Sequence, residues 1–202
     1  MHSNPAFRKP DRTRNLAFAG ERGFGLLTLA GPDGPLASHI PFILSDTGAV
    51  AEMHLTRSNP ILRCDGAAAL LAVVGPDGYV SPDWYGAPEQ VPTWNYVAVH
   101  LRGWVEVLPV EALRPHLERL SARFEEALDK CPWTMGKMTE ESIARMMRMI
   151  VPVALHIEDV AGTWKLNQNK EDGARRGAAT AIPASVGAER EALGQLMLEP
   201  PL

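Results

Sequence analysis

The sequence predicts an α+β fold in which an antiparallel β-barrel carries peripheral helices. Three observations support this prediction. Short apolar segments separated by turn signals fill the first hundred residues, an unusually long strand pattern follows, and helical periodicity begins only after residue 108. Hydrophobic residues make up 46% of the 202 residues and charged residues 22%, which is typical of a globular chain able to bury a core.

Turn signals divide the first part of the chain into strands. Gly31-Pro32-Asp33-Gly34 and Gly75-Pro76-Asp77-Gly78 both have the x-P-D-G pattern, and Ser45-Asp46-Thr47-Gly48 is a third predicted turn. The apolar segments between these turns are the predicted strands, namely Phe24–Ala30, Leu36–Leu44, Ala49–Leu55 and Ala67–Gly75.

The pattern over Asn95–Leu108 predicts a strand too long for a compact sheet unless it curls, which indicates a barrel. Gly103 could supply the bend. One predicted face carries Val97, Val99, Leu101, Val105 and Val107, and the other carries His100, Arg102, Trp104 and Glu106. Alternation over Val151–Ile157 predicts one further, late strand.

Three helices are expected around this barrel. Apolar residues at helical spacing predict a helix over Pro109–Leu128, and Thr139 is the expected N-cap of a second helix that ends at Met149. A third helix should follow Asn169. The predicted domain therefore spans residues 1–182 with a helical insertion at 109–149, and residues 183–202 form a C-terminal tail with one short helix.

Composition excludes several classes of function. A net charge of −4 and a pI near 5.9 argue against a generally basic nucleic-acid binder. No apolar run could span a bilayer and no secretory signal is visible, so we expect a cytoplasmic protein with Cys64 and Cys131 as reduced thiols. The sequence contains no G-x-S-x-G, H-E-x-x-H, GKS/GKT or C-x-x-C motif, and its histidines are isolated, so no metal is expected.

A phosphate seat is the first candidate site, at His54-Leu55-Thr56-Arg57-Ser58-Asn59-Pro60. Ser58 is placed to cap a short helix that runs to Cys64, and a helix start exposes free N–H groups. Thr56 and Ser58 add hydroxyl groups, and Arg57 adds a fork of donors that suits a phosphate. The alternative is an ordinary capped helix with a solvated arginine.

Three more segments could carry a ligand. His39 lies between apolar neighbours in Leu36–Phe42, where a structural role is the alternative. Aromatic residues crowd the segments Tyr79–Tyr85 and Val91–Tyr96, which suits a flat ring system or simply anchors a loop. The segment Gly162–Lys170 is dense in donors, among which Lys165 could reach a phosphate and Gln168 or Asn169 could read ring carbonyls.

These motifs occur in one order, S-H-I-P-F, H-L-T-R-S-N-P, Y-V-S-P-D-W-Y with V-P-T-W-N-Y-V-A-V-H, and G-T-W-K-L-N-Q-N-K. The series resembles the PaiB family of FMN-binding negative transcriptional regulators over roughly Phe7 to Ile182. The resemblance implies an FMN-binding split β-barrel, antiparallel and Greek-key-like, as in pyridoxamine-phosphate oxidases. It also implies a homodimer with flavin mononucleotide (FMN) in two grooves between the subunits.

The resemblance assigns expected roles to nine residues. Thr56, Arg57, Ser58 and Lys165 are candidates for the phosphate, and Asn59 belongs to the same motif. His39, Trp94, Asn95 and Gln168 are candidates for the ring or the ribityl chain. This chain departs from the family pattern in two places, because Asn167 stands where the family usually has Ser and the loop Gly86–Gln90 is short and lacks basic residues.

Three functions remain open on the sequence. The first is a redox-active flavoprotein, uncertain as an enzyme, that exchanges electrons with a small-molecule donor or acceptor. The second is a PaiB-type transcriptional regulator, although the mixed charges of the helix after Pro109 make direct DNA binding unexpected. The third is a haem-handling split-barrel protein, which would need an exposed axial ligand such as His100 or His156.

Overall fold

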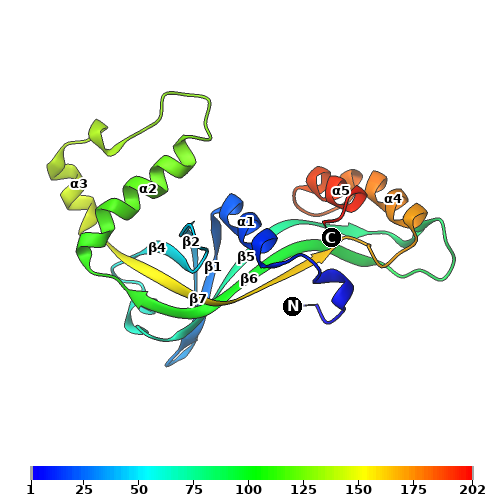
Figure 1. Ribbon diagram of the computed structural model, residues 1–202, viewed down its shortest axis with the longest axis horizontal. Helices are drawn as coiled ribbons and strands as arrows, with labels where there is room; N and C mark the ends of the chain where they lie inside the picture. The colour runs from blue at the N-terminus through cyan, green and yellow to red at the C-terminus, as the bar shows by residue number, and fades with distance from the viewer. Residues whose placement is uncertain (1, 202) are drawn as a thin grey trace. The chain divides into compact units, whose positions relative to one another are not determined.

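The computed structural model describes residues 2–201, which contain seven strands in one antiparallel sheet and five α-helices (Figure 1). The strand order is β2-β1-β5-β6-β7-β4-β3. The strands are β1 (Phe24–Gly31), β2 (Gly34–Pro41), β3 (Ile43–Leu44), β4 (Val50–Thr56), β5 (Ala68–Val80), β6 (Thr93–Val107) and β7 (Ile150–Lys165). The α-helices are α1 (Arg12–Arg22), α2 (Leu113–Glu125), α3 (Glu140–Met147), α4 (Asp172–Ala181) and α5 (Arg190–Leu198).

The described chain divides into two compact units, and the long strands β5, β6 and β7 contribute residues to both. One unit, which we call the strand-rich unit, comprises residues 19–72 and 101–159. The other, which we call the C-terminal unit, comprises residues 1–18, 73–100 and 160–202.

The strand-rich unit contains the predicted hairpins and the helical insertion. Gly31 pairs with Gly34 at the tip of the β1–β2 hairpin, so the first x-P-D-G turn is confirmed. The predicted strand Leu36–Leu44 is two strands, because the chain leaves β2 after Pro41 and the buried Phe42 separates it from β3. The predicted helix Pro109–Leu128 consists of a 3₁₀ turn at Val110–Ala112 followed by α2.

The second x-P-D-G segment is not a turn, and this prediction was wrong. Residues Gly75–Gly78 continue β5, where the N–H groups of Asp77 and Tyr79 donate to the carbonyl oxygens of Ala188 and Val186 at 3.0 Å each. The returning chain near residue 187 therefore completes the hydrogen bonds of β5. Pro76 lacks an N–H to donate, which this arrangement tolerates.

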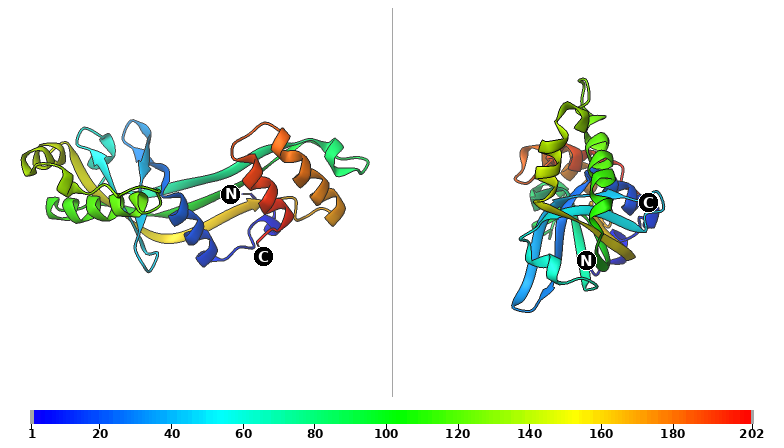
Figure 2. Two further views of the ribbon diagram at one scale, coloured as in Figure 1. Left: turned by 90° about the horizontal axis from the view of Figure 1, so that it is seen from above. Right: turned by 90° about the vertical axis from the view of Figure 1, so that its left-hand side faces the viewer.

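The C-terminal unit has its own core, into which α4 and α5 pack side by side (Figures 1 and 2). Its buried residues come from β5, β6, the end of β7 and both helices: Val80, Tyr85, Val97, Trp164, Leu166, Ala178, Ala179, Ile182, Leu193 and Met197. The segment expected to be a tail therefore holds α5, whose Leu193 and Met197 are fully buried.

The indole of Trp164 anchors the N-terminal segment to this core. Its Nε1–H donates to Oδ1 of the buried Asn15 at 2.8 Å, and the Arg14 guanidinium lies 5.5 Å from the centre of the indole ring. Among the helices of residues 2–201, none combines the length and apolar character that crossing a membrane requires.

Candidate functional site

The nine expected site residues fall into two groups, one in each unit. His39, Thr56, Arg57, Ser58 and Asn59 belong to the strand-rich unit, and Trp94, Asn95, Lys165 and Gln168 belong to the C-terminal unit. Each group is described by itself below.

The segment after β4 starts a short helix, but the capping residue differs from our prediction. The Asn59 side chain, not Ser58, caps the 3₁₀ helix Pro60–Arg63, because its Oδ1 accepts from the Ile61 N–H at 3.0 Å. The other end of the same amide donates to Ser38 Oγ at 3.1 Å. Asn59 is therefore used by the protein itself, whereas the hydroxyl groups of Thr56 and Ser58 remain exposed.

Arg57 is exposed, but backbone carbonyls orient its guanidinium group. Its Nε donates to the Arg148 carbonyl oxygen at 2.7 Å and its Nη2 to the Ile150 carbonyl oxygen at 3.2 Å. The Arg57 N–H also donates to Met149 at 2.8 Å. Arg57 thus ties the end of α3 to the end of β4, and it retains its positive charge for an anion beside this junction.

His39 lies exposed on β2, beside another exposed ring. Its imidazole stacks against Phe24, with ring centres 6.4 Å apart and planes inclined by 20°. The Phe24 side chain is 53% exposed. A flat ligand could stack on the His39 and Phe24 rings. The apolar neighbours of His39 in the sequence did not predict this pair of rings.

Lys165 is a half-buried cation at the end of β7. Its Nζ donates to Thr93 Oγ1, and within residues 2–201 no carboxylate forms an ion pair with it. Burial, and then the nearby charge of Lys170, lower the pKa of the Lys165 ammonium below its usual range. A cation that is partly desolvated and lacks an anionic partner suits a bound phosphate.

Lys170 and Tyr85 complete a polar cluster around Lys165 that the sequence analysis did not single out. The Lys170 Nζ lies 4.8 Å from the centre of the Tyr85 ring and donates to Gln90 Oε1 at 2.5 Å. The Tyr85 hydroxyl donates to Asn167 Oδ1 at 3.4 Å, and burial raises the pKa of this phenol. Gln90 lies in the short loop noted above, so this loop supplies a contact to Lys170 although it contains no basic residue.

The departure at Asn167 has a backbone explanation. Asn167 is buried and has a φ of 62°, in the left-handed region that asparagine tolerates better than serine. Its side chain also accepts the Tyr85 hydrogen bond. Asparagine therefore suits this position in this chain on both counts.

Replacing Asn167 with serine is accordingly expected to destabilise the protein by about 1–2 kcal/mol, from left-handed backbone strain and the lost hydrogen bond. Asn167→Gly removes the hydrogen bond, but glycine adopts the left-handed backbone conformation without strain. This variant should therefore lose less stability than Asn167→Ser. Urea unfolding of both variants measures the difference. A serine variant as stable as the parent would contradict this explanation.

The remaining three candidates in this unit are engaged in different ways. Asn95 is fully buried and its Nδ2 lies 3.4 Å from Met197 Sδ, while its Oδ1 has no partner among the described side chains. The Gln168 amide bonds its own turn, accepting from the Leu166 N–H at 2.8 Å and donating to the Trp164 carbonyl oxygen. Trp94 is 47% exposed and presents a ring to the surface.

A buried histidine pair couples α2 to β4 in the strand-rich unit. His54 Nδ1 and His116 Nε2 are 3.2 Å apart, and the His116 side chain is almost fully buried. Glu52 of β4 forms an ion pair with Arg119 of α2. Burial, with smaller contributions from His54 and Arg119, lowers the pKa of His116 to about 4, and burial also lowers the pKa of His54.

This histidine pair should make stability depend on pH. Because the folded-state pKa of His116 is depressed, the unfolded chain binds the proton first, and stability is lost as pH falls from about 6.5 towards 4. We expect the titration of His116 alone to lower the free energy of unfolding by about 2 kcal/mol when the pH falls from about 7.5 to about 5. Urea unfolding of His116→Gln should show a flatter pH profile, whereas His39→Gln, at an exposed histidine, should keep the parental slope.

His156, one of the two histidines considered for haem, is occupied by neighbours. Its Nε2 lies 2.6 Å from Glu106 Oε2, and its ring stacks on Trp104 with centres 4.0 Å apart. An axial ligand must offer a free nitrogen to the iron, so these contacts weigh against His156 in that role. The residues described contain no cluster of three or more side chains able to hold a metal ion.

Comparison with known proteins identifies the family. Residues 1–159 match the family described as "Putative FMN-binding domain". The chain belongs to this family. It is also 30% identical over 159 residues to the protease synthase and sporulation protein PAI 2 of Bacillus subtilis, an alignment that covers 77% of this chain and 76% of that protein. The PaiB resemblance and the expected cofactor, FMN, are thereby confirmed.

Solved structures confirm the fold of this FMN-binding family member. The FAD and heme binding protein from Mycobacterium smegmatis has a TM-score of 0.57 at 21% identity, covering 79% of this chain and 73% of that one. The flavocytochrome Anf3 from Azotobacter vinelandii has a TM-score of 0.56 at 15% identity, covering 81% and 72%. The predicted split-barrel architecture is therefore correct.

The side chains present suit FMN. Its phosphate requires positive groups and donors, which Lys165 with Thr93 supplies in one unit and Arg57 with Thr56 and Ser58 supplies in the other. Its flat ring system requires apolar walls, and each group includes exposed aromatic side chains, Trp94 in one and Phe24 in the other. The donor set therefore fits an anionic, aromatic cofactor.

Proposed function

We propose that this protein is a redox-active flavoprotein that holds FMN through these residues. The observation that carries the proposal is Lys165, a partly desolvated ammonium whose described partner is a hydroxyl group rather than a carboxylate. FMN, when bound, supplies hydride and single-electron transfer. The protein's part is to bind the phosphate, to orient the ring and to limit the access of water.

The proposed phosphate contacts form two sets, one in each unit. Lys165 is the cation of the C-terminal unit, whereas in the strand-rich unit Arg57 balances the charge of the phosphate and the hydroxyl groups of Thr56 and Ser58 donate to its oxygens. Trp94 in the first unit and His39 in the second are proposed to line the ring. Asn59, Asn95 and Gln168 are proposed to act mainly by shaping the backbone around the cofactor, because their amides already bond protein groups.

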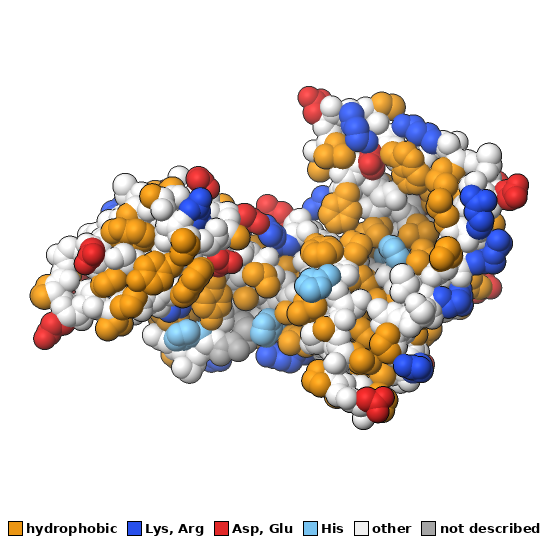
Figure 3. Space-filling view, turned by 180° about the vertical axis from the view of Figure 1, so that it is seen from behind, with side chains coloured by type: hydrophobic (Ala, Val, Ile, Leu, Met, Phe, Trp, Pro, Cys, Tyr) orange, Lys and Arg blue, Asp and Glu red, His pale blue; other side chains and the backbone are white. Residues whose placement is uncertain are grey.

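We also propose that the protein acts as a homodimer. Exposed hydrophobic side chains are spread over the face shown in Figure 3, and several aromatic or long apolar residues are more than a third exposed. Such exposure favours an interface with another protein surface. The expected partners are a second copy of this chain and a small-molecule electron donor or acceptor.

Direct DNA binding receives less support. The α2 arginines, which offer the most visible row of positive charge, already bond protein groups. Arg114 bonds Glu140, Arg119 pairs with Glu52, and Arg123 donates to the Gly20 carbonyl oxygen at 3.4 Å. Arginines engaged in this way offer little charge for phosphate neutralisation.

Reconstitution with FMN tests the proposed function. The purified chain, incubated with FMN and desalted, should retain flavin absorbance and quench flavin fluorescence, and the bound flavin should be reducible by a nicotinamide donor or dithionite. A chain that releases all flavin on desalting and shows no binding by calorimetry would overturn the proposal. A salt-dependent gel shift with its own promoter DNA would instead favour the regulator.

A further inference from the structure

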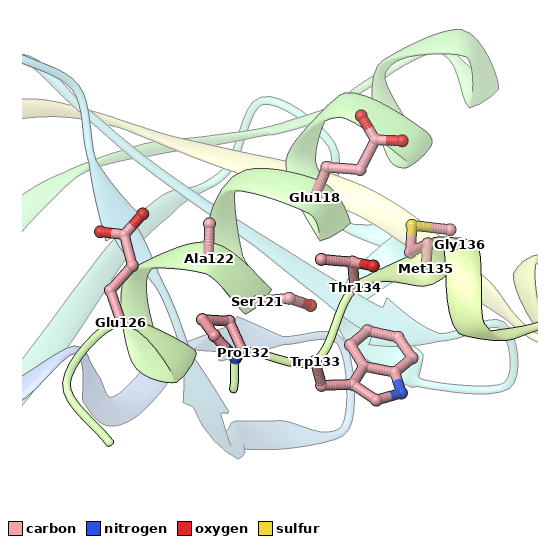
Figure 4. A pocket seen from close by; sticks show the side chains of 9 residues that line it. All are labelled: Glu118, Ser121, Ala122, Glu126, Pro132, Trp133, Thr134, Met135 and Gly136. Carbon is pink, nitrogen blue, oxygen red and sulfur yellow. The ribbon is translucent and has the colours of Figure 1, made fainter. Parts of the chain in front are cut away.

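A surface cavity in the helical insertion lies outside every residue proposed to hold FMN. Its volume is about 330 Å³, and it opens between α2 and the loop that follows it (Figure 4). Helix α2 contributes Glu118, Ser121, Ala122 and Glu126, and the loop contributes Pro132, Trp133, Thr134, Met135 and Gly136. All these residues belong to the strand-rich unit.

A second, smaller cavity of about 130 Å³ adjoins the first, since Ser121, Trp133 and Met135 line both. Its other walls are apolar and come from α2, α3 and the start of β7: Leu117, Met138, Ile143, Met146, Met147 and Ile150. Methionine side chains are flexible and polarisable, so such walls adapt to apolar ligands of varied shape. Together the two cavities form one largely apolar space, and two carboxylates line the larger cavity.

Two carboxylates give the larger cavity its charge. Glu118 of α2 and Glu126, the C-cap of this helix, lie on one stripe with Ala122 between them, so their backbone positions are roughly 12 Å apart along the helix axis. Figure 4 shows their side chains on either side of Ala122.

One nearby cation is shared between two carboxylates. Arg114 bonds Glu140 at 2.8 Å and also forms an i,i+4 ion pair with Glu118 at 3.7 Å. Throughout residues 2–201, no lysine or arginine forms an ion pair with Glu126. Lys130 is paired with a different carboxylate, that of Glu125.

Glu125 holds the aromatic wall in place. Its carboxylate accepts from the Trp133 N–H at 2.7 Å and pairs with Lys130. The Lys130 hydrogen bond, followed by that of Trp133, lowers the pKa of Glu125, so this group stays ionised and keeps the loop closed against α2. Because the Trp133 donor is its backbone N–H, the loop backbone that carries the indole is held against the end of α2 before any ligand arrives, which limits the entropy lost on binding.

We infer that this cavity binds a small organic cation with an apolar body. The ammonium group lies in the larger cavity, where Glu118 and Glu126 attract it and the Trp133 ring offers a cation–π contact. The apolar body occupies the smaller, methionine-lined cavity. The inference is independent of the flavin, because none of these residues belongs to the proposed FMN contacts.

Three probes of matched shape test the inference: 4-phenylbutylammonium, 4-phenylbutanol and 4-phenylbutyrate, each titrated calorimetrically into the full chain. We expect the ammonium to bind about tenfold or more tightly than the alcohol, and the carboxylate to bind weakest. Equal affinity for all three probes, or no binding of any, would overturn the inference.

Matched variants locate the binding. Glu118→Gln combined with Glu126→Gln should remove the preference for the ammonium while leaving the alcohol's affinity unchanged. Glu111→Gln removes one carboxylate charge from the same insertion, and Glu111 lines neither cavity, so this variant should bind all three probes like the parent. Trp133→Leu should weaken the binding of all three probes. An ammonium preference that survives in the double variant would place the site elsewhere.

Discussion

Replacing Gly103 with alanine is expected to destabilise the protein strongly. A Cβ at this position would lie 1.7 Å from the carbonyl oxygen of His156 and 2.7 Å from its carbonyl carbon. Both atoms belong to the backbone of β7 and cannot rotate away, so β6 and β7 would have to separate locally. We expect a loss of about 3 kcal/mol or more, which lowers the melting temperature by roughly 6–12 °C.

Gly173→Ala is the matched control for this prediction. Gly173 lies in the first turn of α4, and a Cβ there would meet no atom within 4 Å. Alanine should therefore stabilise this helix slightly, by about 0.5–1 kcal/mol. Urea and thermal unfolding of both variants give the comparison. If Gly103→Ala unfolds like the parent, β7 does not approach β6 as closely as described.

The sequence indicated Gly103 for a related but different reason. Period-two alternation correctly predicted the buried face from Val97 to Val105, because a half-buried strand exposes alternate side chains, whereas Val107 at the end of this face is only partly buried. Gly103 was expected to permit a bend. The structure adds a tighter constraint, since the neighbouring strand occupies the space of its missing side chain. Such a contact joins residues 53 positions apart, which local patterns cannot reveal.

The failed turn at Gly75–Gly78 has a similar cause. Its local pattern matches Gly31–Gly34, which does turn, so the difference between them arises from tertiary structure. Phe18 lies against Gly75, and Ile182 and Leu193 lie against Gly78. The core of the C-terminal unit therefore extends over the segment and keeps it extended. Residues near 187, more than a hundred positions away, supply the hydrogen bonds.

The candidate site was predictable as a set of residue types but not as a set of contacts. The motif around Arg57 correctly indicated exposed donors after a strand, yet the capping role belongs to Asn59. The Lys170–Tyr85 contact and the His54–His116 pair each join distant segments without a local motif. Lone histidines and lysines in a sequence carry no information about such partners, so sequence reasoning missed both.

Replacing Lys165 with methionine is expected to weaken FMN binding by about ten- to a hundredfold. The change removes the charge that would face the phosphate but keeps most of the length of the side chain, and a charged hydrogen bond is worth roughly 1.5–3 kcal/mol. Riboflavin, which lacks the phosphate, should bind the parent and Lys165→Met with equal affinity. Titration of both flavins by fluorescence quenching separates a phosphate contact from a general effect on the fold.

A pH series adds an independent check on this assignment. Because burial and Lys170 lower the pKa of Lys165, its ammonium should lose its proton earlier than an ordinary lysine as pH rises. The FMN affinity of the parent should therefore decline as the pH rises into the alkaline range, whereas the FMN affinity of Lys165→Met should not show this decline. Lys9→Met, at an exposed lysine of the same unit, should behave like the parent in both measurements.

Comparison with Arg57→Gln decides which cation dominates the phosphate contact. Arg57 already donates to the carbonyl groups of Arg148 and Ile150, so its loss should destabilise the flavin-free protein as well as weaken FMN binding. Lys165 donates only to a hydroxyl group among its described partners, so its loss should reduce FMN affinity with little change in unfolding. If Lys165→Met leaves FMN affinity unchanged while Arg57→Gln lowers it selectively over riboflavin, the phosphate lies beside Arg57 instead.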